Sequence, residues 1–364
     1  MRFDGNSLAK HGTVERQGWM PSAKDPVRQG RFDAGPVSYV GYSEDEPPRL
    51  IVGIDTEAEF DWGQPFSRTK TSVDSVAELN RVQDIFDRYG IVPTYLVDFA
   101  VADNEAAVRS LREFQDAGRG EIGAHLNSWL NPPFDESGGR VHSYACNLSV
   151  ELEHRKLERL TAKISEQFGQ SPRVYRAGRY GIGPDTGKIL EDLDYCVDMS
   201  VVPYTCFTED GGPDFRDLDH RPFRFGPTKG LLEIPVSCGF SGWLAGIGKP
   251  VFPVLSSRAG LWLRVPGIFA RLRALERIRL TPEGSDFAEL CRLTEGLHGI
   301  GCRVFSFTFH GPSLAPGNTP YVRDKQELKD FLRTVKRYCD YFVNELGGKA
   351  SKPIEIFHSI GKGG

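Results

Sequence analysis

The chain has 364 residues, of which 39% are hydrophobic and 26% charged, and it carries a formal net charge of −4. This composition is that of an ordinary globular protein, long enough for one large α/β barrel or two average domains. No run of Lys or Arg is interleaved with aromatic residues, so nucleic acid is not an expected partner. The longest apolar stretches are interrupted well short of a membrane span, so no transmembrane segment is expected.

Seven cysteines are scattered along the chain without a C-x-x-C pair, and several of them lie in apolar runs. This pattern is typical of buried, reduced thiols in a reducing compartment. The N-terminus, from Met1 to Gly5, lacks the apolar core of a signal peptide. We therefore expect a cytoplasmic protein.

Residues 1–48 are polar, contain Gly and Pro, and show no apolar periodicity, which predicts a flexible or loosely docked N-terminal extension. Order is expected to begin at the apolar run 50–54, which is typical of a strand buried on both faces. Ser75 and Glu78 have the spacing of a capping box and predict a helix that ends near Gly90.

Strand and helix patterns then alternate as far as residue 358. Apolar runs predict strands at 93–97, 121–126, 174–177, 195–197, 231–236 and 304–309, with 354–357 as a further strand that closes the sheet. Helical spacing predicts helices at 108–118, 157–168 and 189–193, and from Asp324 to Phe342. Seven or eight strands separated by helices predict a parallel α/β barrel over 49–358, with an open doubly wound sheet as the alternative.

The segment from about 201 to 280 breaks this alternation. It is rich in Gly, Pro and aromatic residues, and it includes a basic stretch around Arg271 and Arg277 that predicts a helix. We interpret the segment as a cap insertion beside the site. Neither a G-x-G-x-x-G nor a P-loop follows the first strand, so nucleotide binding has no local support.

Five short polar segments stand at or just after predicted strand ends. They are 54–57, 124–129, 175–181, 197–200 and 307–311. Because the carboxyl ends of parallel strands meet at one mouth of a barrel, these segments can share one site. They supply acidic, His, Arg, Asp and His side chains, which are the parts needed for metal-assisted hydrolysis.

The first two segments indicate a metal site. Asp55 and Glu57 are two residues apart and fall on the same face of a strand. Side-by-side carboxylates suit a metal ligand beside a general base, whereas an isolated pair more often caps a helix. His125 ends another strand and suits imidazole ligation of a divalent metal, although a lone His there is more often structural.

The other three segments indicate an acid–base set. Arg176 at a strand end can hold a carboxylate bidentately, or it can pair with the barrel rim. Asp198 lies in an apolar stretch and needs a partner, because an unpaired buried carboxylate is costly. His310 follows the strong strand 304–309, and a His held by a buried Asp is a common general acid.

Together these residues resemble the polysaccharide deacetylases of the NodB-homology class over about residues 49–358. The sequence is similar to a branch that opens with D-x-E or D-x-D, here Asp55-Thr56-Glu57, and closes with H-x-P-S-L, here His310-Gly311-Pro312-Ser313-Leu314. The resemblance implies an irregular (β/α)7 TIM-like barrel, a divalent metal that is commonly zinc, and hydrolysis of an N- or O-acyl group on a sugar.

By position, the resemblance also implies roles for single residues. Asp55 matches the catalytic base and Arg176 the residue that braces it. Asp198 matches the Asp that orients the final His, and His310 matches the general acid. These roles imply a contact between Arg176 and Asp55 and a hydrogen bond between Asp198 and His310.

The metal ligands match the family less well. Glu57 matches its acidic ligand and His125 its first metal His, but Asn127 stands where this branch has a second His. An Asn can ligate a hard cation through its carbonyl oxygen and is a poor zinc ligand. We expect a metal site built on Glu57 and His125, completed by Asn127 or by water, with His142 and Asp61 as substitutes that match no motif.

Two functions are therefore predicted. The first is a metal-dependent amidohydrolase that acts on a sugar, a nucleotide-linked sugar or a lipid-linked glycan precursor and removes an acetyl or formyl group. The second is a catalytically weakened member of the family that binds a carbohydrate or a partner protein. Asn127 supports the second function, while the retained Asp55, Arg176, Asp198 and His310 support the first.

Overall fold

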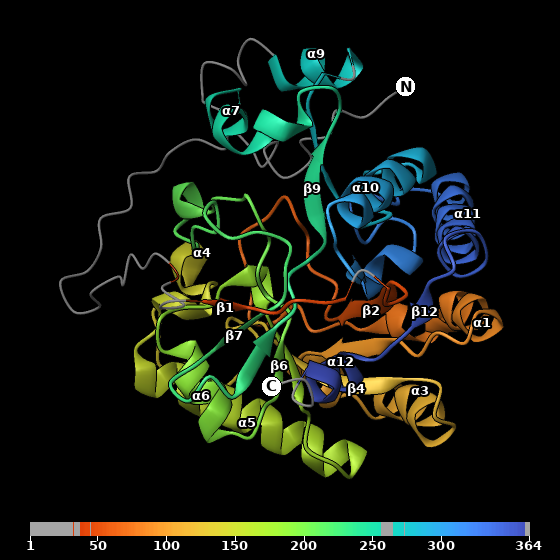
Figure 1. The fold of residues 1–364 in the computed structure, drawn as a ribbon. Coiled ribbons are helices and arrows are strands. Elements are labelled where there is room, and N and C mark those ends of the chain that lie inside the picture. Colours follow the sequence, from red (N-terminus) through yellow and green to blue (C-terminus); the bar gives the residue numbers. More distant parts are fainter. Residues whose placement is uncertain (1–31, 33–36, 44, 256–264, 273, 361–364) are drawn as a thin grey trace.

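A curled, mostly parallel sheet forms the core of the computed structural model, which describes residues 32, 37–43, 45–255, 265–272 and 274–360. Its strands run in the order β1-β7-β8-β6-β5-β4-β3-β2-β11, with β12 also paired to β2. Every pair from β8 to β11 is parallel, whereas β1 and β7 run antiparallel at one edge. This is the expected curled α/β barrel (Figure 1).

The parallel strands carry the polar segments at matching heights. Their bounds are β2 Arg49–Thr56, β3 Thr94–Val97, β4 Glu121–Leu126, β5 Val174–Ala177, β6 Val197–Asp198, β8 Leu231–Glu233 and β11 Val304–His310. In register, Asp55 lies opposite His310, and His125 lies opposite Arg176. Because the strands are parallel, these side chains reach the same mouth of the barrel.

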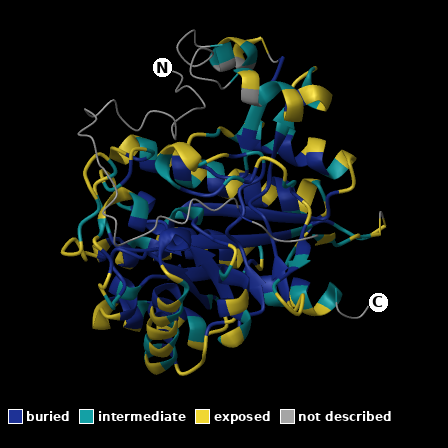
Figure 2. Ribbon diagram, turned by 90° about the vertical axis from the view of Figure 1, so that its left-hand side faces the viewer, coloured by how far each residue is buried: buried dark blue, intermediate teal, exposed yellow. Residues whose placement is uncertain are grey.

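Helices cover the outer face of the sheet, so the strands are buried and the outward helix faces are exposed (Figure 2). Between the first strands lie η1 Asp74–Leu79, α1 Asn80–Arg88, α2 Phe99–Ala102, α3 Glu105–Asp116, α4 Gly139–His142, η2 Ala145–Asn147 and α5 Val150–Phe168. Further along the chain lie η3 Gly178–Tyr180, α6 Thr186–Asp192, η4 Thr208–Asp210, α10 Phe287–Gly299, η6 Gly311–Leu314, α11 Lys325–Asp340, η7 Tyr341–Glu345, β12 Lys349–Ala350 and α12 Pro353–Ile360.

Local sequence explains where these helices begin and end. The α5 helix starts after Ser149, whose side chain accepts a hydrogen bond from the backbone N–H of Leu152. It ends at Gly169, whose φ of 75° is left-handed and favours glycine. Its stripe of Leu157, Leu160 and Ile164 is fully buried against the sheet.

Part of the predicted N-terminal extension belongs to the sheet. Ser38–Tyr39 form β1, which pairs antiparallel with β7 Phe223–Phe225. Phe32 is buried, with its ring centroid 5.8 Å from that of Phe215. Of the two expectations for 1–48, a flexible segment is wrong at residues 32 and 38–39, which dock on the barrel. Residues 1–31, 33–36 and 44 lie outside the described residues.

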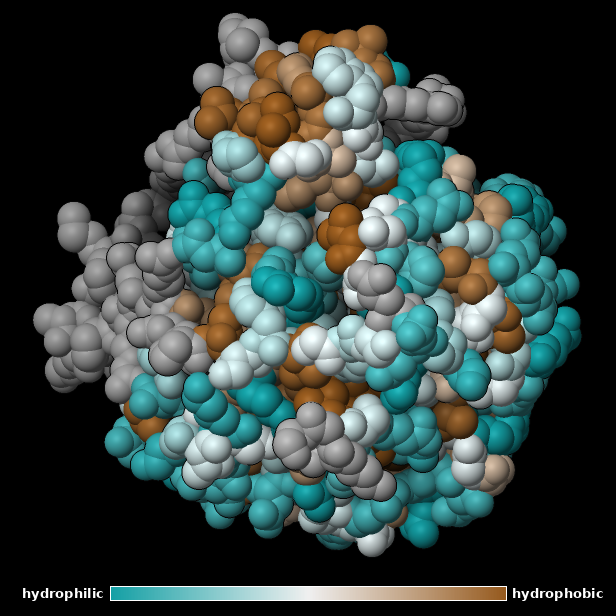
Figure 3. Space-filling view, viewed as in Figure 1, coloured by the Kyte–Doolittle hydropathy of each residue, from teal (hydrophilic) through white to brown (hydrophobic). Residues whose placement is uncertain are grey.

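The segment 201–280 divides between the sheet and the space above it. β7 and β8 join the main sheet. β9 Cys238–Ser241 and β10 Glu276–Arg279 form a separate antiparallel pair, and η5 Ala245–Ile247, α7 Gly248–Leu255 and α9 Val265–Arg271 lie at its upper end (Figure 1). Arg277 lies in β10 rather than in the predicted basic helix. Hydrophobic side chains gather over α7 and α9 (Figure 3).

The residues that flank β9 and β10 close the free edge of β11. The Leu280 N–H donates to the Ser237 carbonyl at 2.8 Å, and the Thr308 N–H donates to the Leu280 carbonyl at 3.1 Å. The Ser306 N–H also donates to Oγ of Ser237 at 2.9 Å. The residues that follow β10 therefore lie next to the end of β11.

Three local predictions differ from the structure. Residues 354–357 form part of α12 and not a closing strand. Ser75 caps no helix, because η1 begins after Val73 without a side-chain cap and the Ser75 N–H donates to Glu59 instead. The α10 helix, which has a complete capping box of Asp286 and Glu289, was not predicted. Among the described residues, no helix is long and apolar enough to cross a membrane.

Candidate active site

The strand ends surround a cavity of about 510 Å³ at one mouth of the barrel. Asp55, Glu57, His125, Asn127 and His310 all line it, as the sequence predicts. Asp55 and Glu57 lie at or directly after the carboxyl end of β2, and His125 and Asn127 lie at or directly after the carboxyl end of β4. His310 is the last residue of β11. One mouth therefore holds the candidate base, the candidate acid and the candidate metal ligands.

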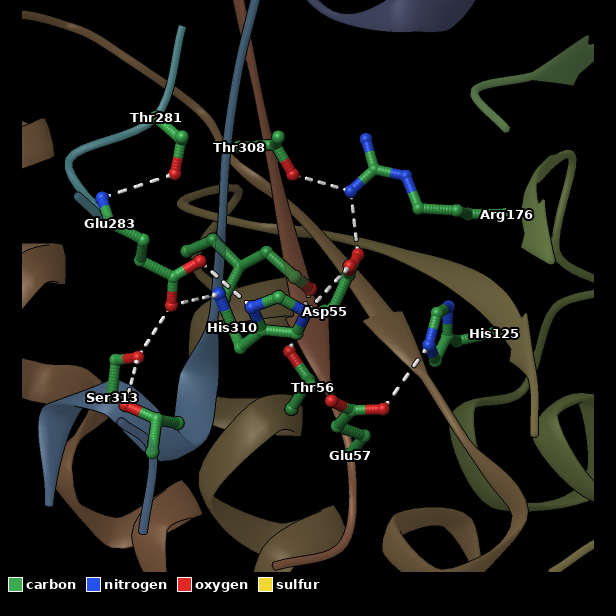
Figure 4. Close-up of polar contacts among 12 residues, drawn as sticks. Asp55, Thr56, Glu57, His125, Arg176, Thr281, Glu283, Thr308, His310 and Ser313 are labelled. Atoms are coloured by element: carbon green, nitrogen blue, oxygen red, sulfur yellow. Dashed lines mark hydrogen bonds and ion pairs between the residues drawn. The ribbon is translucent and has the colours of Figure 1, made fainter. Parts of the chain in front are cut away.

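Asp55 is held as an ionised carboxylate. It is 3% exposed, and Nη1 of Arg176 donates to its Oδ1 at 2.6 Å (Figure 4). Arg176 is itself anchored, because its Nε donates to the Met199 carbonyl and Nη1 also reaches Thr308. Burial opposes ionisation of Asp55, but Arg176 and two nearby imidazoles outweigh it and lower the pKa of Asp55. The predicted contact between Arg176 and Asp55 is confirmed.

His310 is held by Glu283, which follows β10. Nδ1 of His310 lies 2.8 Å from Oε2 of Glu283, and the His310 N–H donates to Oε1 at 3.1 Å (Figure 4). Oγ of Ser313 donates to the same carboxylate. Burial alone would lower the pKa of His310, but Glu283 outweighs it and raises the pKa to about 9. His310 is therefore cationic at neutral pH, with Nε2 only 3.9 Å from Oδ2 of Asp55.

The expected hydrogen bond between Asp198 and His310 is wrong. Asp198 accepts from Oγ of Ser200 and lies beside Glu233, its register partner on β8. Both carboxyl groups are fully buried, and burial raises the pKa of Asp198 to about 6 and that of Glu233 further. The strand pairing explains the error, because Asp198 lies in register with Glu233 on β8, whereas the segment after β10 adjoins β11 and brings Glu283 to His310.

The candidate metal ligands meet in a second buried cluster. Nε2 of His125 lies 3.3 Å from Oε2 of Glu57 (Figure 4). Nδ2 of Asn127 donates to the same Glu57 oxygen at 2.8 Å and to Oδ2 of Asp98 at 3.3 Å. Burial lowers the pKa of His125, but the charges of Asp55 and Glu57 outweigh it and leave the pKa raised. The three predicted ligands therefore do converge.

Asp98 is a member of this cluster that sequence reasoning did not single out. It caps α2 by accepting from the Val101 N–H, and its other oxygen accepts from the Ala58 N–H. Burial raises its pKa to about 6, since the two backbone donors only partly offset the loss of hydration. Its position directly after β3 was the available signal, because neighbouring strand ends meet at one mouth.

Two of the three predicted ligands fit a metal ion. A tetrahedral zinc with bonds of about 2.0–2.2 Å separates its ligand atoms by roughly 3.3–3.5 Å, which matches the spacing of Glu57 and His125. Asn127 does not fit as oriented, because it presents its NH2 group and its Oδ1 is buried without a partner. Within the described residues, no group of three or more His, Cys, Asp or Glu can hold a metal, so Asp61 and His142 do not replace it.

Aromatic rings form one wall of the cavity. Trp62 stacks with Phe60 at 5.2 Å between centroids and meets the His310 ring edge-on at 5.0 Å. Tyr321 lies parallel to that imidazole at 6.5 Å and meets Trp62 edge-on at 5.9 Å. These rings restrict access of water to His310 and offer an apolar surface beside the acid–base pair.

Glu283 was missed because the strand that precedes it was interpreted as a basic helix. The alternation Glu276-Arg277-Ile278-Arg279 has the period of a half-exposed strand, and only Ile278 of these residues is fully buried. An acid just after such a strand was a signal of the same kind as Asp55.

Comparison with known proteins establishes the fold. No family model and no curated protein sequence matches the chain. A Mycobacterium smegmatis protein assigned to the polysaccharide deacetylases has a TM-score of 0.51 at 15% identity, over 89% of this chain and 94% of its own. The chain has the same α/β-barrel fold as this protein. PuuE allantoinase has a TM-score of 0.50 at 14% identity, over 89% and 96% of the two chains.

Proposed function

We propose that the chain is a metal-dependent hydrolase that removes an N-acyl group, acetyl or formyl, from an amino sugar. The observation that carries this proposal is the pair formed by Asp55 and His310. An ionised carboxylate and a protonated imidazole stand 3.9 Å apart at a cavity, each fixed by its own buried partner. Hydrolysis of an amide needs a base to deprotonate water and an acid to protonate the leaving amine.

Asp55 acts first in this scheme. It accepts a proton from a water molecule as the water oxygen attacks the acyl carbon. Arg176 keeps the carboxylate ionised and fixes its orientation. Nε2 of His310 then gives its proton to the leaving nitrogen, the C–N bond breaks, and a carboxylic acid and a free amine result. Glu283 holds the imidazole cation in place throughout.

A divalent metal, with zinc as the expected ion, would be held by Glu57 and His125. When bound, such an ion polarises the acyl carbonyl and lowers the pKa of water. Asn127 would complete the ligand set only after its amide turns, since its NH2 group faces Glu57. Two strong ligands bind more weakly than three, so we expect metal to be lost readily during purification.

The expected substrate is a soluble, nucleotide-linked or lipid-linked sugar. The aromatic wall at Phe60, Trp62 and Tyr321 supports this class, because C–H faces of sugars pack on such rings. A cavity of about 510 Å³ accommodates one or two sugar units. A cytoplasmic location, as expected from the sequence, favours a precursor over a finished polymer.

The decisive experiment measures release of acetate and formate from N-acyl amino sugars with added zinc, cobalt or manganese. We expect turnover with a metal, none after chelation, and none for Asp55→Asn. Asp330→Asn is the matched control, since Asp330 is exposed on α11 and pairs only along that helix. Turnover by Asp55→Asn at the wild-type rate would rule the proposal out.

One observation favours a second function, a weakened member of the family that binds a carbohydrate without cleaving it. The Asn127 amide joins Glu57 to Asp98 and so satisfies carboxylates that a cation would otherwise neutralise. Metal content after incubation with excess zinc separates the two functions. Protein that takes up no zinc and cleaves no N-acyl sugar, yet still binds sugar, would establish the second function.

A further inference from the structure

The cavity holds further charged side chains besides the base, the acid and the candidate ligands. Arg140, Arg179, Arg279 and Asp210 all line it. Arg140 lies 2.8 Å and Arg179 lies 3.3 Å from the same Asp210 oxygen. Asp210 is thus shared by two arginines, and Arg279 is a third cation at the same cavity.

Arg279 differs from the other two arginines. Arg179 is bound on every side, since it also donates to Oγ of Ser143 at 2.7 Å and stacks over Tyr144 at 3.9 Å. Arg279 is half-buried, and no residue that the structure describes forms a hydrogen bond or ion pair with its side chain. A partly buried guanidinium group without an anion beside it is unfavourable. An anion bound in the cavity would therefore stabilise Arg279, and the described part of the chain does not itself supply one.

The hydroxyl of Tyr180 is the second donor without a partner. Burial raises the pKa of Tyr180 to about 12, and Tyr180 lines the same cavity as Arg279. No described residue forms a hydrogen bond with the hydroxyl. Tyr180 and Arg179 have φ angles of 60° and 55°, which are left-handed and unfavourable for non-glycine residues. Such strain is retained where a side chain must take one position.

We propose that Arg279 and the Tyr180 hydroxyl bind an oxyanion on the substrate, a carboxylate, phosphate or sulfate, so that the substrate is an acidic N-acyl amino sugar. The proposal rests on the proposed function, because it names the substrate class of the same site. A guanidinium presents two parallel N–H groups to such an anion, and a phenol adds a third donor.

The test is direct binding, measured by calorimetry on the metal-free protein, so no turnover is required. The probes are N-acetylglucosamine, its 6-phosphate, its 6-sulfate and N-acetylglucosaminuronic acid. We expect at least one anionic probe to bind about tenfold or more tightly than the neutral sugar, as charged hydrogen bonds imply. The probe with the largest preference identifies the anion as phosphate, sulfate or carboxylate.

Variants then identify the residues that cause the preference for an anionic probe. Arg279→Gln should abolish it and leave affinity for the neutral sugar unchanged, and Tyr180→Phe should reduce it in part. Arg279→Lys keeps the charge without the planar fork and should retain an intermediate preference. Arg333→Gln, on the exposed face of α11, is the matched control. Equal affinity of wild-type protein for all four probes, or equal weakening of neutral and anionic probes by Arg279→Gln, would overturn the proposal.

The outcome is separable from that of the proposed function. If anionic probes bind through Arg279 but no acyl bond is cleaved with any metal, the hydrolase fails and the anion site stands. If neutral N-acyl sugars are cleaved and Arg279→Gln changes neither affinity nor rate, the anion site fails and the hydrolase stands.

Discussion

The two halves of the site differ in how completely they are built. In the acid–base half, Asp55 has Arg176 and His310 has Glu283, and each partner is anchored by further contacts. In the ligand half, Nδ1 of His125 and Oδ1 of Asn127 are both buried without a partner. The side chains of the acid–base half are therefore held in place before any substrate binds. In the ligand half, two buried polar atoms have no hydrogen-bond partner among the residues that the structure describes.

The two halves also differ in the hydrogen-bond support of their imidazoles. A metal-ligating imidazole usually donates its second N–H to a carboxylate or carbonyl, which fixes its tautomer. That support is missing at His125 among the described residues, while the equivalent support at His310 is complete. Substitutions in the two halves should therefore act differently, and four predictions sharpen or break the comparison.

The largest effect is expected in the acid–base half. Asp55→Asn keeps the size of the side chain but removes the base, so the rate should fall on the order of 10²–10⁴-fold. Because an amide cannot ion-pair with Arg176, some stability should be lost too, and circular dichroism must show that the fold persists. A rate within twofold of wild type in folded protein would mean that another residue acts as the base.

Glu283→Gln should act mainly on pH dependence. Glu283 holds the pKa of His310 up against burial, so its removal lets the pKa fall from about 9 toward or below its usual value. The acid form of His310 is then lost on the alkaline side at a lower pH, and the rate at pH 8 should drop about 10-fold or more. A pH–rate profile checks this, and an unmoved alkaline limb would mean that His310 is not the acid.

Asn127→His tests the incomplete half. It supplies the nitrogen that the resemblance expects beside His125, and we expect metal affinity to rise about tenfold or more, since even outer partners change affinity about 10–100-fold. Metal content after dialysis is the measurement, with Asn131→His as a control away from Glu57. Unchanged metal content in Asn127→His and in Glu57→Ala would end the metal interpretation.

The smallest effect concerns a proton that the buried carboxyl groups of Asp198 and Glu233 are expected to share. A carboxyl whose folded pKa is raised keeps its proton while the unfolded chain loses it, so stability declines as pH rises from about 4 to about 6 for Asp198. Glu233 extends the decline to higher pH. Glu233→Gln donates permanently to Asp198 and should flatten this slope, with a gain of about 1 kcal/mol at pH 8. Denaturant unfolding at several pH values measures it, and an unaltered slope would contradict the shared proton.

The sequence predicted most of the barrel because its parallel strands are apolar throughout. Runs such as 50–54 and 304–309 can be little else than strands buried on both faces. It could not predict how the barrel closes, because β10 reads as a short polar alternation and its pairing with β9 spans more than thirty residues. For that reason Asp198 was expected to hold His310, whereas in the structure Glu283 does so. The choice between them depends on which segment lies beside β11.

The ligand half shows the complementary limit. Their positions at strand ends in the sequence predicted that Glu57, His125 and Asn127 would meet. They did not predict which end of the Asn127 amide would face Glu57. That choice depends on Asp98, which competes for the same amide hydrogens and whose role emerges only from the packed cluster. Residue type predicts possible ligands, and only the neighbours decide whether they act as donors or acceptors.

Arg279 and Glu283 lie four residues apart on one short stretch of chain, which Leu280 ties to Thr308 on β11. The residue proposed to hold the far end of the substrate and the residue that positions the proton donor therefore cannot move independently. Attachment of a remote substituent at Arg279 would thus be converted into alignment of His310 with the leaving amine. A substrate stripped of that substituent should lose turnover number more than apparent affinity.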